Sequence, residues 1–352
     1  MANRRAPGRD AIDGVLAGLY GDDEPLHADA AGAAGSTGAG VLEQISAYPR
    51  IEPVPHWHLI SYGMTELYEK TSDNHRHSGC GFEFTLRVAR APTEIEPPTW
   101  ALNLLRYLAE HQAEIDAWWS SRPVRLGGPI APNLDTQLRA VMFVGDPELP
   151  WIETVHGDLG FLQVVGLTLD EVQAAELWSV ASFEKLFATK FPLYVTEPSR
   201  ASALADPEFA AAAAAGSAEH GSYTNRLVMD VRWSVVDGAA VVTVGAADVD
   251  SLRRMIQARL PYDRSLLVAG PTHRIRFVPG TSFRVREYPA HQPDKPYHHL
   301  ALRVPQAAVA TLADVLYPET GDHPVPGLPL TVHIERSETR SGGTGEIVDT
   351  VG

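Results

Sequence analysis

The stretch that decides the fold reads HWHLISYGMTELYEK at residues 56–70, HSGCGFEFTLRVAR at 77–90 and PPTW at 97–100. Apolar and polar residues alternate over 82–88, which predicts a strand with one buried aromatic face and one wetter face that carries Glu83. Gly79 and Gly81 stand just before this strand, where a bulge or a close backbone approach requires a residue without a Cβ atom.

A helix is predicted to begin soon after this strand. Pro97 and Pro98 end the sheet, and Thr99 is the expected N-cap. One helical face then collects the apolar residues Trp100, Leu104, Leu108, Ile115 and Trp119.

Length and composition limit the class of protein. The chain has 352 residues, which suggests about two domains, and its 44% hydrophobic content allows a sizeable core. The net charge of −15 argues against a nucleic-acid partner, which requires basic surface. Cys80 is the only cysteine, so no intrachain disulfide can form. No apolar run suits a membrane span or a signal peptide, so we expect a cytoplasmic protein without a membrane partner.

Composition also suggests where domains begin and end. The Ala-, Gly- and Ser-rich stretch 201–222 separates a first domain at 11–215 from a second at 216–336. The polar ends of the chain, 1–10 and 337–352, are expected to be disordered tails.

Several short signals predict single elements in the first domain. Residues 29–40 are rich in Gly and Ala and are expected to form a flexible loop. Residues 41–48 suggest a short helix or turn, and 193–195 a short strand. Thr168 and Glu171 form a capping box, which predicts that a helix begins there.

Other signals predict elements of the second domain. Two β-rich runs joined by Asp237-Gly238 predict a hairpin with a type I′ turn. A helix capped by Asp248 or Asp250 is expected next, followed by two strands on either side of Pro279-Gly280.

Two groups of side chains invite a metal-binding interpretation. His75, His77 and Cys80 are ligand types that suit zinc, but no second cluster accompanies them, so a polar loop is favoured. His56 and His58 project from the same side of a strand, and no third ligand is placed near them. We therefore favour histidines with satisfied nitrogens and expect neither a metal nor a cofactor.

Other residues invite a catalytic or binding interpretation. Glu83 lies among aromatic residues and could act as a general acid or base, although a carboxylate satisfied by structural partners is commoner. Cys80, between two glycines, is expected to pack as a small apolar residue. Trp118 is a candidate anchor for a partner, whereas Trp119 continues the helical stripe and favours the core.

Charge is distributed unevenly along the chain. Residues 251–300 contain nine Lys and Arg and three acidic residues, which gives this window a local charge of +6. Solvated strand and helix faces are one interpretation. The other is attraction between the two domains, or an acidic partner that docks on the second one.

The chain resembles the Suppressor of fused family over residues 11–335, strongly in the first domain and faintly in the second. The strings HWHLISYGMTELYE, SGCGFEFTLRV, PPTW and FPLYVTEPSR resemble its N-terminal domain, as does VMFVGDPELPWIETVHGDLGFLQVVGLTLDEVQAAELW. The string SLRRMIQARLPYDRSLLVAG resembles the start of its C-terminal half.

The resemblance implies an α+β fold of two lobes, each a mixed or antiparallel sheet with flanking helices, and a protein that is not an enzyme. It also marks a set of motif residues as structural: Trp57, His58, Tyr62, Gly79, Gly81, Glu83, Pro98, Trp100 and Trp178.

In animal members of the family the lobes close on a short peptide of a transcription factor, which adds as a strand. Carried over to this chain, the resemblance places the walls of that cleft at 111–128 and 247–252. The partner-binding residues would be His111, Trp118, Arg125, Asp248, Asp250 and Leu252.

The two walls are the places where the sequence departs most from the family pattern, and the Ala- and Arg-rich composition looks bacterial. Bacterial relatives include immunity proteins that neutralise toxins by binding them. We therefore expect a monomeric, non-enzymatic immunity protein of a polymorphic toxin system, with a toxin domain or another polypeptide held between the lobes. The alternative is a cleft enzyme, possibly metal-dependent, that uses Glu83 or the pair His56 and His58.

Overall fold

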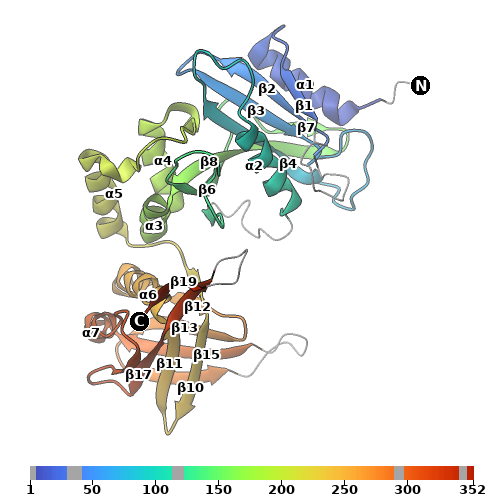
Figure 1. The fold of residues 1–352 in the computed structure, drawn as a ribbon. Helices are drawn as coiled ribbons and strands as arrows, with labels where there is room; N and C mark the ends of the chain where they lie inside the picture. Colours follow the sequence, from blue (N-terminus) through green and yellow to red (C-terminus); the bar gives the residue numbers. More distant parts are fainter. Residues whose placement is uncertain (1–4, 30–41, 113–122, 289–296, 341–346) are drawn as a thin grey trace. The chain divides into compact units, whose positions relative to one another are not determined.

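The computed structural model describes residues 5–29, 42–112, 123–288, 297–340 and 347–352. The chain divides into two compact units (Figure 1). Unit 1 comprises residues 1–175 and 180–212, and unit 2 comprises 176–179 and 213–352.

Unit 1 is built on an eight-stranded sheet. Along the sheet the order is β1 (Leu26–Asp29), β2 (Gln44–Arg50), β3 (His56–Tyr62), β4 (His77–Ala89), β8 (Gly157–Thr168), β6 (Leu138–Gly145) and β5 (Val124–Arg125), with β7 (Ile152–Thr154) also paired to β8. The pairing of β4 with β8 is parallel and that of β6 with β8 antiparallel, so the sheet is mixed.

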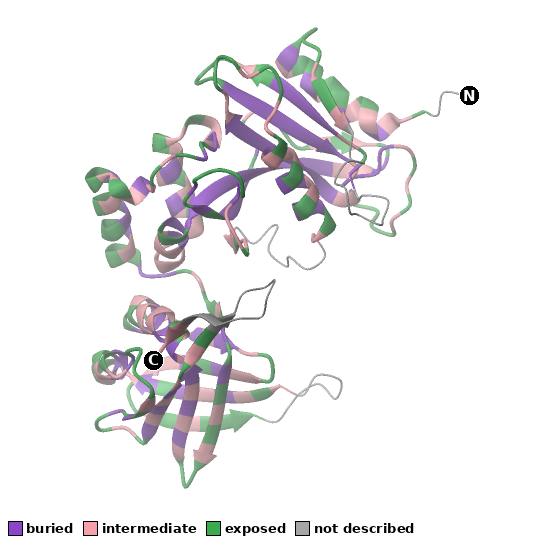
Figure 2. Cartoon of the chain, viewed as in Figure 1, coloured by how far each residue is buried: buried purple, intermediate pink, exposed green. Residues whose placement is uncertain are grey.

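Helices cover both faces of this sheet. The helix α1 (Pro7–Tyr20) packs through Ile12 and Leu16 on one face, and α2 (Thr99–Glu110) packs through Leu105 and Leu108 on the other. The central strands are therefore buried along almost their whole length (Figure 2). The prediction of a wetter face on β4 was wrong, because α1 and buried polar partners cover that face too.

Three further helices complete unit 1 and lead into unit 2: α3 (Leu169–Leu177), α4 (Val180–Lys190) and α5 (Pro207–His220). The predicted capping contact is confirmed, since the Thr168 amide donates to Glu171 Oε2 at 2.9 Å. The predicted strand at 193–195 is instead the 3₁₀ turn η1 (Pro192–Tyr194), in which Leu193 and Tyr194 both have positive φ.

Three boundaries in unit 1 also differ from those expected. Helix α1 begins at Pro7, inside the predicted tail, because Gly8 fits against the Glu66 carbonyl, where a Cβ atom would lie 2.1 Å from the oxygen. Residues 44–50 form strand β2 and no helix, since all seven pair with β3. Pro98, and not Thr99, is the N-cap of α2, which ends at Glu110. The rest of the predicted helix and most of the predicted flexible loop lie outside the described residues.

Unit 2 contains two larger sheets. One has the order β10 (Val231–Val236), β11 (Ala239–Gly245), β17 (Leu330–Glu335) and β16 (Gly321–Pro324). The other has the order β14 (Arg284–Tyr288), β15 (His298–Pro305), β13 (His273–Gly280), β12 (Leu266–Ala269) and β9 (Arg226–Val228). Their inner faces share one core with α6 (Ala246–Arg259) and α7 (Val309–Asp314). Burial alternates along these strands (Figure 2).

The hairpin of β10 and β11 is confirmed, with Asp237 and Gly238 at φ 50° and 79°, as a type I′ turn requires. Gly245 and neither aspartate is the N-cap of α6. The predicted disordered tail after residue 336 contains the paired strands β18 (Ser337–Arg340) and β19 (Ile347–Val351). The α+β class, with mixed sheets flanked by helices, is confirmed.

Candidate functional site

Glu83 lies at the centre of a closed structural site. Its side chain is fully buried, and its two oxygens accept five hydrogen bonds. The donors are the hydroxyls of Ser61 and Thr65, both at 2.6 Å, and the amides of Gly63, Met64 and Thr65. Burial raises the pKa of this carboxyl, while the five donors favour its charged form. With no exposed oxygen, Glu83 fastens the turn after β3 and reaches no substrate.

The loop between β3 and β4 is organised by a second carboxylate. Glu66 accepts from the amides of Thr71, Ser72 and Gly79 and from the ammonium of Lys70. Burial opposes its ionisation, but these donors hold the pKa of Glu66 well below its usual range. Gly79 has φ +51°, and a Cβ atom there would lie 2.6 Å from the Met64 carbonyl oxygen. The predicted need for glycine before the strand is therefore confirmed at this position.

The histidines and the cysteine that were considered as metal ligands are not gathered into a cluster. Among the described residues, no group of three or more His, Cys, Asp or Glu side chains is placed to hold a metal ion. Cys80 is half-buried against the core under α2, and burial raises the pKa of its thiol.

His58 belongs to a buried polar network on the α1 side of the sheet. Its Nε2 donates to Asp146 Oδ2 at 3.2 Å, and its Nδ1 accepts from the Tyr20 hydroxyl at 2.5 Å. Burial, and then the positive charge of Arg87, lower the pKa of His58 to about 4. His56, the other histidine of the pair, is also buried, and its Nδ1 donates to the Val54 carbonyl. Its Nε2 has no hydrogen-bond partner among the described residues, so the expectation of satisfied nitrogens was wrong for this ring. Neither ring reaches solvent, so the pair offers no site for general acid–base catalysis.

The charge at the centre of this network belongs to Arg87. Its guanidinium donates to both oxygens of Asp146, at 2.7 and 3.1 Å, and to Glu148 at 2.9 Å. It also donates to the amide oxygen of Gln163. Burial opposes ionisation of Asp146, but His58 and Arg87 hold the pKa of its carboxyl far below the usual range. Asp146, the acidic residue of the Asp-Pro turn that the sequence predicted, thus neutralises the buried Arg87, which lies 59 positions earlier in the chain.

The other motif residues have structural surroundings as well. Trp57 and Tyr62 are buried, and the Tyr62 hydroxyl donates to Asp13 at 2.7 Å. Trp178 follows α3 and packs against Gly216, where a Cβ atom would approach its ring to 2.3 Å. Gly81 has φ +82°.

The predicted partner-binding residues have different surroundings. His111 ends α2 and lies beside Tyr107, with ring centroids 4.2 Å apart, and Arg125 is in the edge strand β5. Trp118 lies outside the described residues. The second predicted wall, 247–252, is part of helix α6, whose helical backbone does not present the edge of a strand to which another strand could pair.

Within this wall Leu252 is 2% exposed and packs in the core, and its role in partner binding stays a prediction. Asp250 pairs with Arg253 at 2.7 Å. Burial, followed by the charge of Asp230, raises the pKa of Asp248. Because Asp248 and Asp250 lie in a helix, they could contact a partner through their side chains but could not pair with it through the backbone.

Two features that the sequence reasoning missed are open to a partner. An apolar groove of about 480 Å³ lies between α2 and the segment 126–133, next to β5. Trp100, Tyr107, Leu126 and Ile130 are among its lining residues. In unit 2, β9 ends a sheet, and no other described strand pairs with its outer side. The sequence Gly127-Gly128-Pro129, which lines the groove, was the signal by which the groove could have been found. The strand β9 has only three residues, which is too short for a periodic pattern to predict it.

No described helix is long and apolar enough to cross a bilayer.

Comparison with known proteins points to one family. Residues 41–201 match the family model described as Suppressor of fused protein (SUFU). The Suppressor of fused homologs of Homo sapiens and Mus musculus are each 31% identical to the chain over 198 residues. These alignments cover 52% of this chain but only 40% of either relative, so the chain matches less than half of their length.

Solved structures extend the likeness in fold. The crystal structure of Drosophila Suppressor of Fused matches with a TM-score of 0.73 and 19% identity, over 95% of this chain and 98% of that one. A chain of the Sufu–Fu complex matches with a TM-score of 0.52 and 24% identity, over 58% of this chain and 96% of that one. The fold expected from the resemblance is confirmed.

Proposed function

We propose that this chain is a member of the Suppressor of fused family and that it is a non-enzymatic regulator that binds a partner polypeptide. The observation that carries the proposal is the family match at residues 41–201. A structural relative is a complex of Sufu with Fu, so this fold can hold another protein. We propose that the partner adds a strand to a sheet edge.

The edge of β9 supports this mode of binding. Leu267 donates its amide to the Asn225 carbonyl, and the Met229 amide donates to Ala269, so these alternate positions face β12. The backbone groups of successive residues in a strand point to opposite sides, so the amide and carbonyl of Val228 point away from β12, towards the open edge of the sheet. The Val228 side chain is 63% exposed, so a polypeptide can approach this edge.

The groove beside β5 supports the same proposal in unit 1. It is predominantly apolar, and the Tyr107 side chain on its rim is 46% exposed. A strand added to a sheet gains affinity from its main chain and selectivity from pockets that hold its side chains. This groove is such a pocket for an apolar side chain of the partner. That the partner lies between the two units stays a prediction.

No specific observation favours the enzyme alternative. The oxygens of Glu83 and the nitrogens of His58 are occupied by groups of the protein itself, and both side chains are fully buried. We propose that these groups stabilise the sheet and that the chain has no catalytic activity.

We further propose that the protein is a bacterial, cytoplasmic monomer and that its partner is a toxin domain, which it neutralises by binding. The test expresses a gene adjacent to its own in a bacterial host, alone and together with this chain. We expect growth to stop with the neighbour alone and to resume when this chain is present.

Variants of Val228 test the mode of binding. Val228→Pro removes the outward amide but leaves both hydrogen bonds to β12, so rescue of growth should be lost. Val228→Ala, the matched control, keeps the amide and should still rescue. Rescue by both variants would exclude strand addition at β9, and a neighbour without toxicity would exclude the immunity role.

A further inference from the structure

The outer face of the five-stranded sheet in unit 2 is unusually rich in arginine. Leu300 and Leu302 of β15 point into the core, so the alternate residues of these strands point outward. The outward residues include six arginines, which together we call the arginine face: Arg226, Arg274, Arg276, Arg284, Arg286 and Arg303.

Strand register places these arginines beside one another. Arg276 of β13 and Arg286 of β14 flank Ala301 of β15, each directly opposite it. Arg303 and Arg284 are paired in the adjacent row. Across strands such neighbours lie about 5 Å apart, and along one strand outward residues recur every ~7 Å. The face is therefore a regular array of positive charge.

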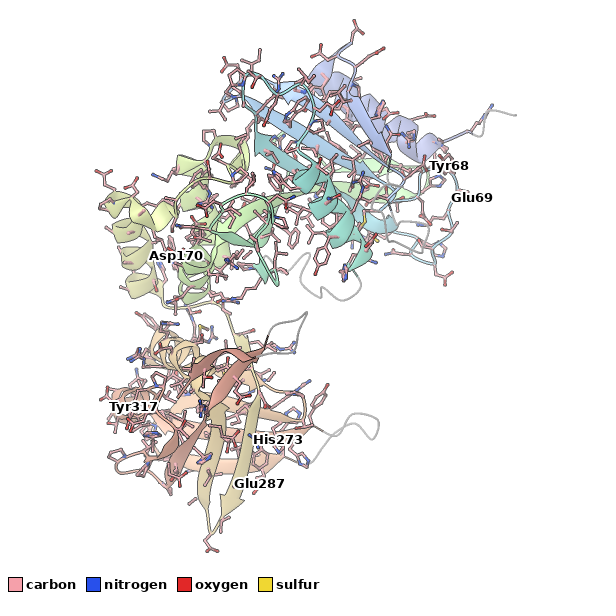
Figure 3. All side chains as sticks on the ribbon, in the orientation of Figure 1. Tyr68, Glu69, Asp170, His273, Glu287 and Tyr317 are labelled. Carbon is pink, nitrogen blue, oxygen red and sulfur yellow. The ribbon has the colours of Figure 1, made fainter. Side chains whose placement is uncertain are left out.

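No acid of these strands neutralises the array. Glu287 of β14, labelled in Figure 3, is opposite Leu300 and so belongs to the other side of the sheet. Among the described residues, no carboxylate forms an ion pair with any of five members of the face: Arg274, Arg276, Arg284, Arg286 and Arg303. By contrast, Arg87, Arg200 and Arg232 all have carboxylate partners.

This positive face is local. Unit 1 contains 15 basic and 28 acidic residues, and unit 2 contains 14 basic and 16 acidic residues. A long polyanion that approaches the protein is therefore repelled overall, since the full chain has a net charge of −15. A short acidic segment that covers only the arginine face meets attraction.

We infer that the arginine face docks an acidic segment of a polypeptide, with carboxylates at alternate positions of an extended chain. An extended segment repeats its side chains every ~7 Å on one side, which matches the spacing of Arg274 with Arg276 and of Arg284 with Arg286. Each guanidinium can bind a carboxylate through two parallel hydrogen bonds. The inference rests on the proposed function in that the ligand is a polypeptide.

Two observations favour a polypeptide over a nucleic acid. Binding of single strands depends on exposed aromatic faces on which bases stack. The two tyrosines nearest the array are already engaged, since Arg274 lies 3.7 Å from the ring centre of Tyr297 and Arg286 lies 4.7 Å from that of Tyr288. The second observation is the net negative charge of the chain, which opposes any long polyanion.

The test measures binding of a fluorescent peptide of about twelve residues, alternating glutamate and serine, by anisotropy at about 50 mM salt. The matched peptide has glutamine for glutamate. We expect the acidic peptide alone to bind, more weakly at higher salt. The double charge reversal Arg276→Glu with Arg286→Glu should weaken binding of the acidic peptide at least ~10-fold, because it removes the positive charge at the centre of the array.

Arg139→Glu, at an exposed position of β6 in unit 1, is the matched control for the single reversal Arg276→Glu, because each replaces one exposed strand arginine and changes the net charge by the same amount. It should leave binding unchanged. If the double reversal lowers stability, Arg276→Gln with Arg286→Gln should weaken binding by a smaller factor and in the same direction.

Absence of binding, or equal loss in the Arg139 control, would overturn the inference. Tighter binding of a single-stranded oligonucleotide, or of vesicles rich in phosphatidylserine, would also overturn it in favour of those ligands. Because the probe is a synthetic peptide and Val228 is unchanged, failure here leaves strand addition at β9 untouched. Failure of the Val228 experiment likewise leaves the arginine face intact.

Discussion

Replacing Asp146 by asparagine should destabilise unit 1 strongly. The substitution keeps the shape of the side chain but removes the charge that faces Arg87, and both side chains are fully buried. Breaking a buried ion pair on one side typically costs 3–5 kcal/mol, because the remaining charge is left uncompensated. Glu148 still contacts Arg87 at 2.9 Å and is partly exposed, so we place the cost near the lower bound, about 3 kcal/mol.

The assay is urea unfolding of the full chain, followed by tryptophan fluorescence. Five of the seven tryptophans belong to unit 1, so this signal follows mainly that unit. Glu43→Gln is the control, because it breaks a pair with Arg9 in which Glu43 is 43% exposed, and such pairs contribute about 1 kcal/mol or less.

A double-mutant cycle with Arg87→Met isolates the pair itself. We expect a coupling free energy of about 2 kcal/mol or more between Asp146 and Arg87, since they share a bidentate contact. If Asp146→Asn costs no more than Glu43→Gln, or if the coupling is near zero, the network does not hold Arg87 in the way described and the reasoning fails.

Two more predictions concern the same unit. Because the pKa of His58 falls from 6.5 to about 4 on folding, the unfolded chain takes up its proton first, and stability is lost as pH falls from 6.5 towards 4. The free energy of unfolding in urea should therefore fall by about 2 kcal/mol less between pH 7 and pH 5 in His58→Gln than in the parent. An equal fall in both proteins would contradict this. Gly79→Ala should cost about 2 kcal/mol or more by the same measurement, since it adds a Cβ atom at positive φ against the Met64 carbonyl. Its control, Gly14→Ala on the open side of α1, should be neutral or stabilising, and equal losses would refute the argument.

Local signals predicted local structure well. The glycine before β4, the type I′ turn at Asp237-Gly238 and the contact between Thr168 and Glu171 each depend on residues close in sequence. The burial of Arg87 could not be predicted in this way, because its partners Asp146 and Gln163 come from distant strands. An arginine that alternates with apolar residues in a strand is predicted to face solvent, and only knowledge of its distant partners would predict that it is buried.

The candidate site was harder for the same reason. Which strand ends a sheet depends on the pairing of all the others, and three residues of β9 gave no periodic pattern of their own. The positive window at 251–300 was visible in the sequence, but only the register shows that its arginines from β13 and β14 share a face with Arg303 of β15. The second predicted wall, 247–252, lies in the helix α6 and at no open strand edge, which the position of these residues in the sequence could not show.

The two units divide stability and recognition between them. In unit 1 the charges on the central strands are buried and paired, so the sheet is fixed, and its edge at β5 and the nearby groove are open to a partner. In unit 2 the outer face of the five-stranded sheet carries Arg274, Arg276, Arg284, Arg286 and Arg303, with which no carboxylate of the described residues forms an ion pair. Main-chain bonding at an edge accepts many sequences, whereas an array of guanidinium groups accepts only a matching pattern of acids. A protein that uses both can hold its partner through the backbone and still select it by charge.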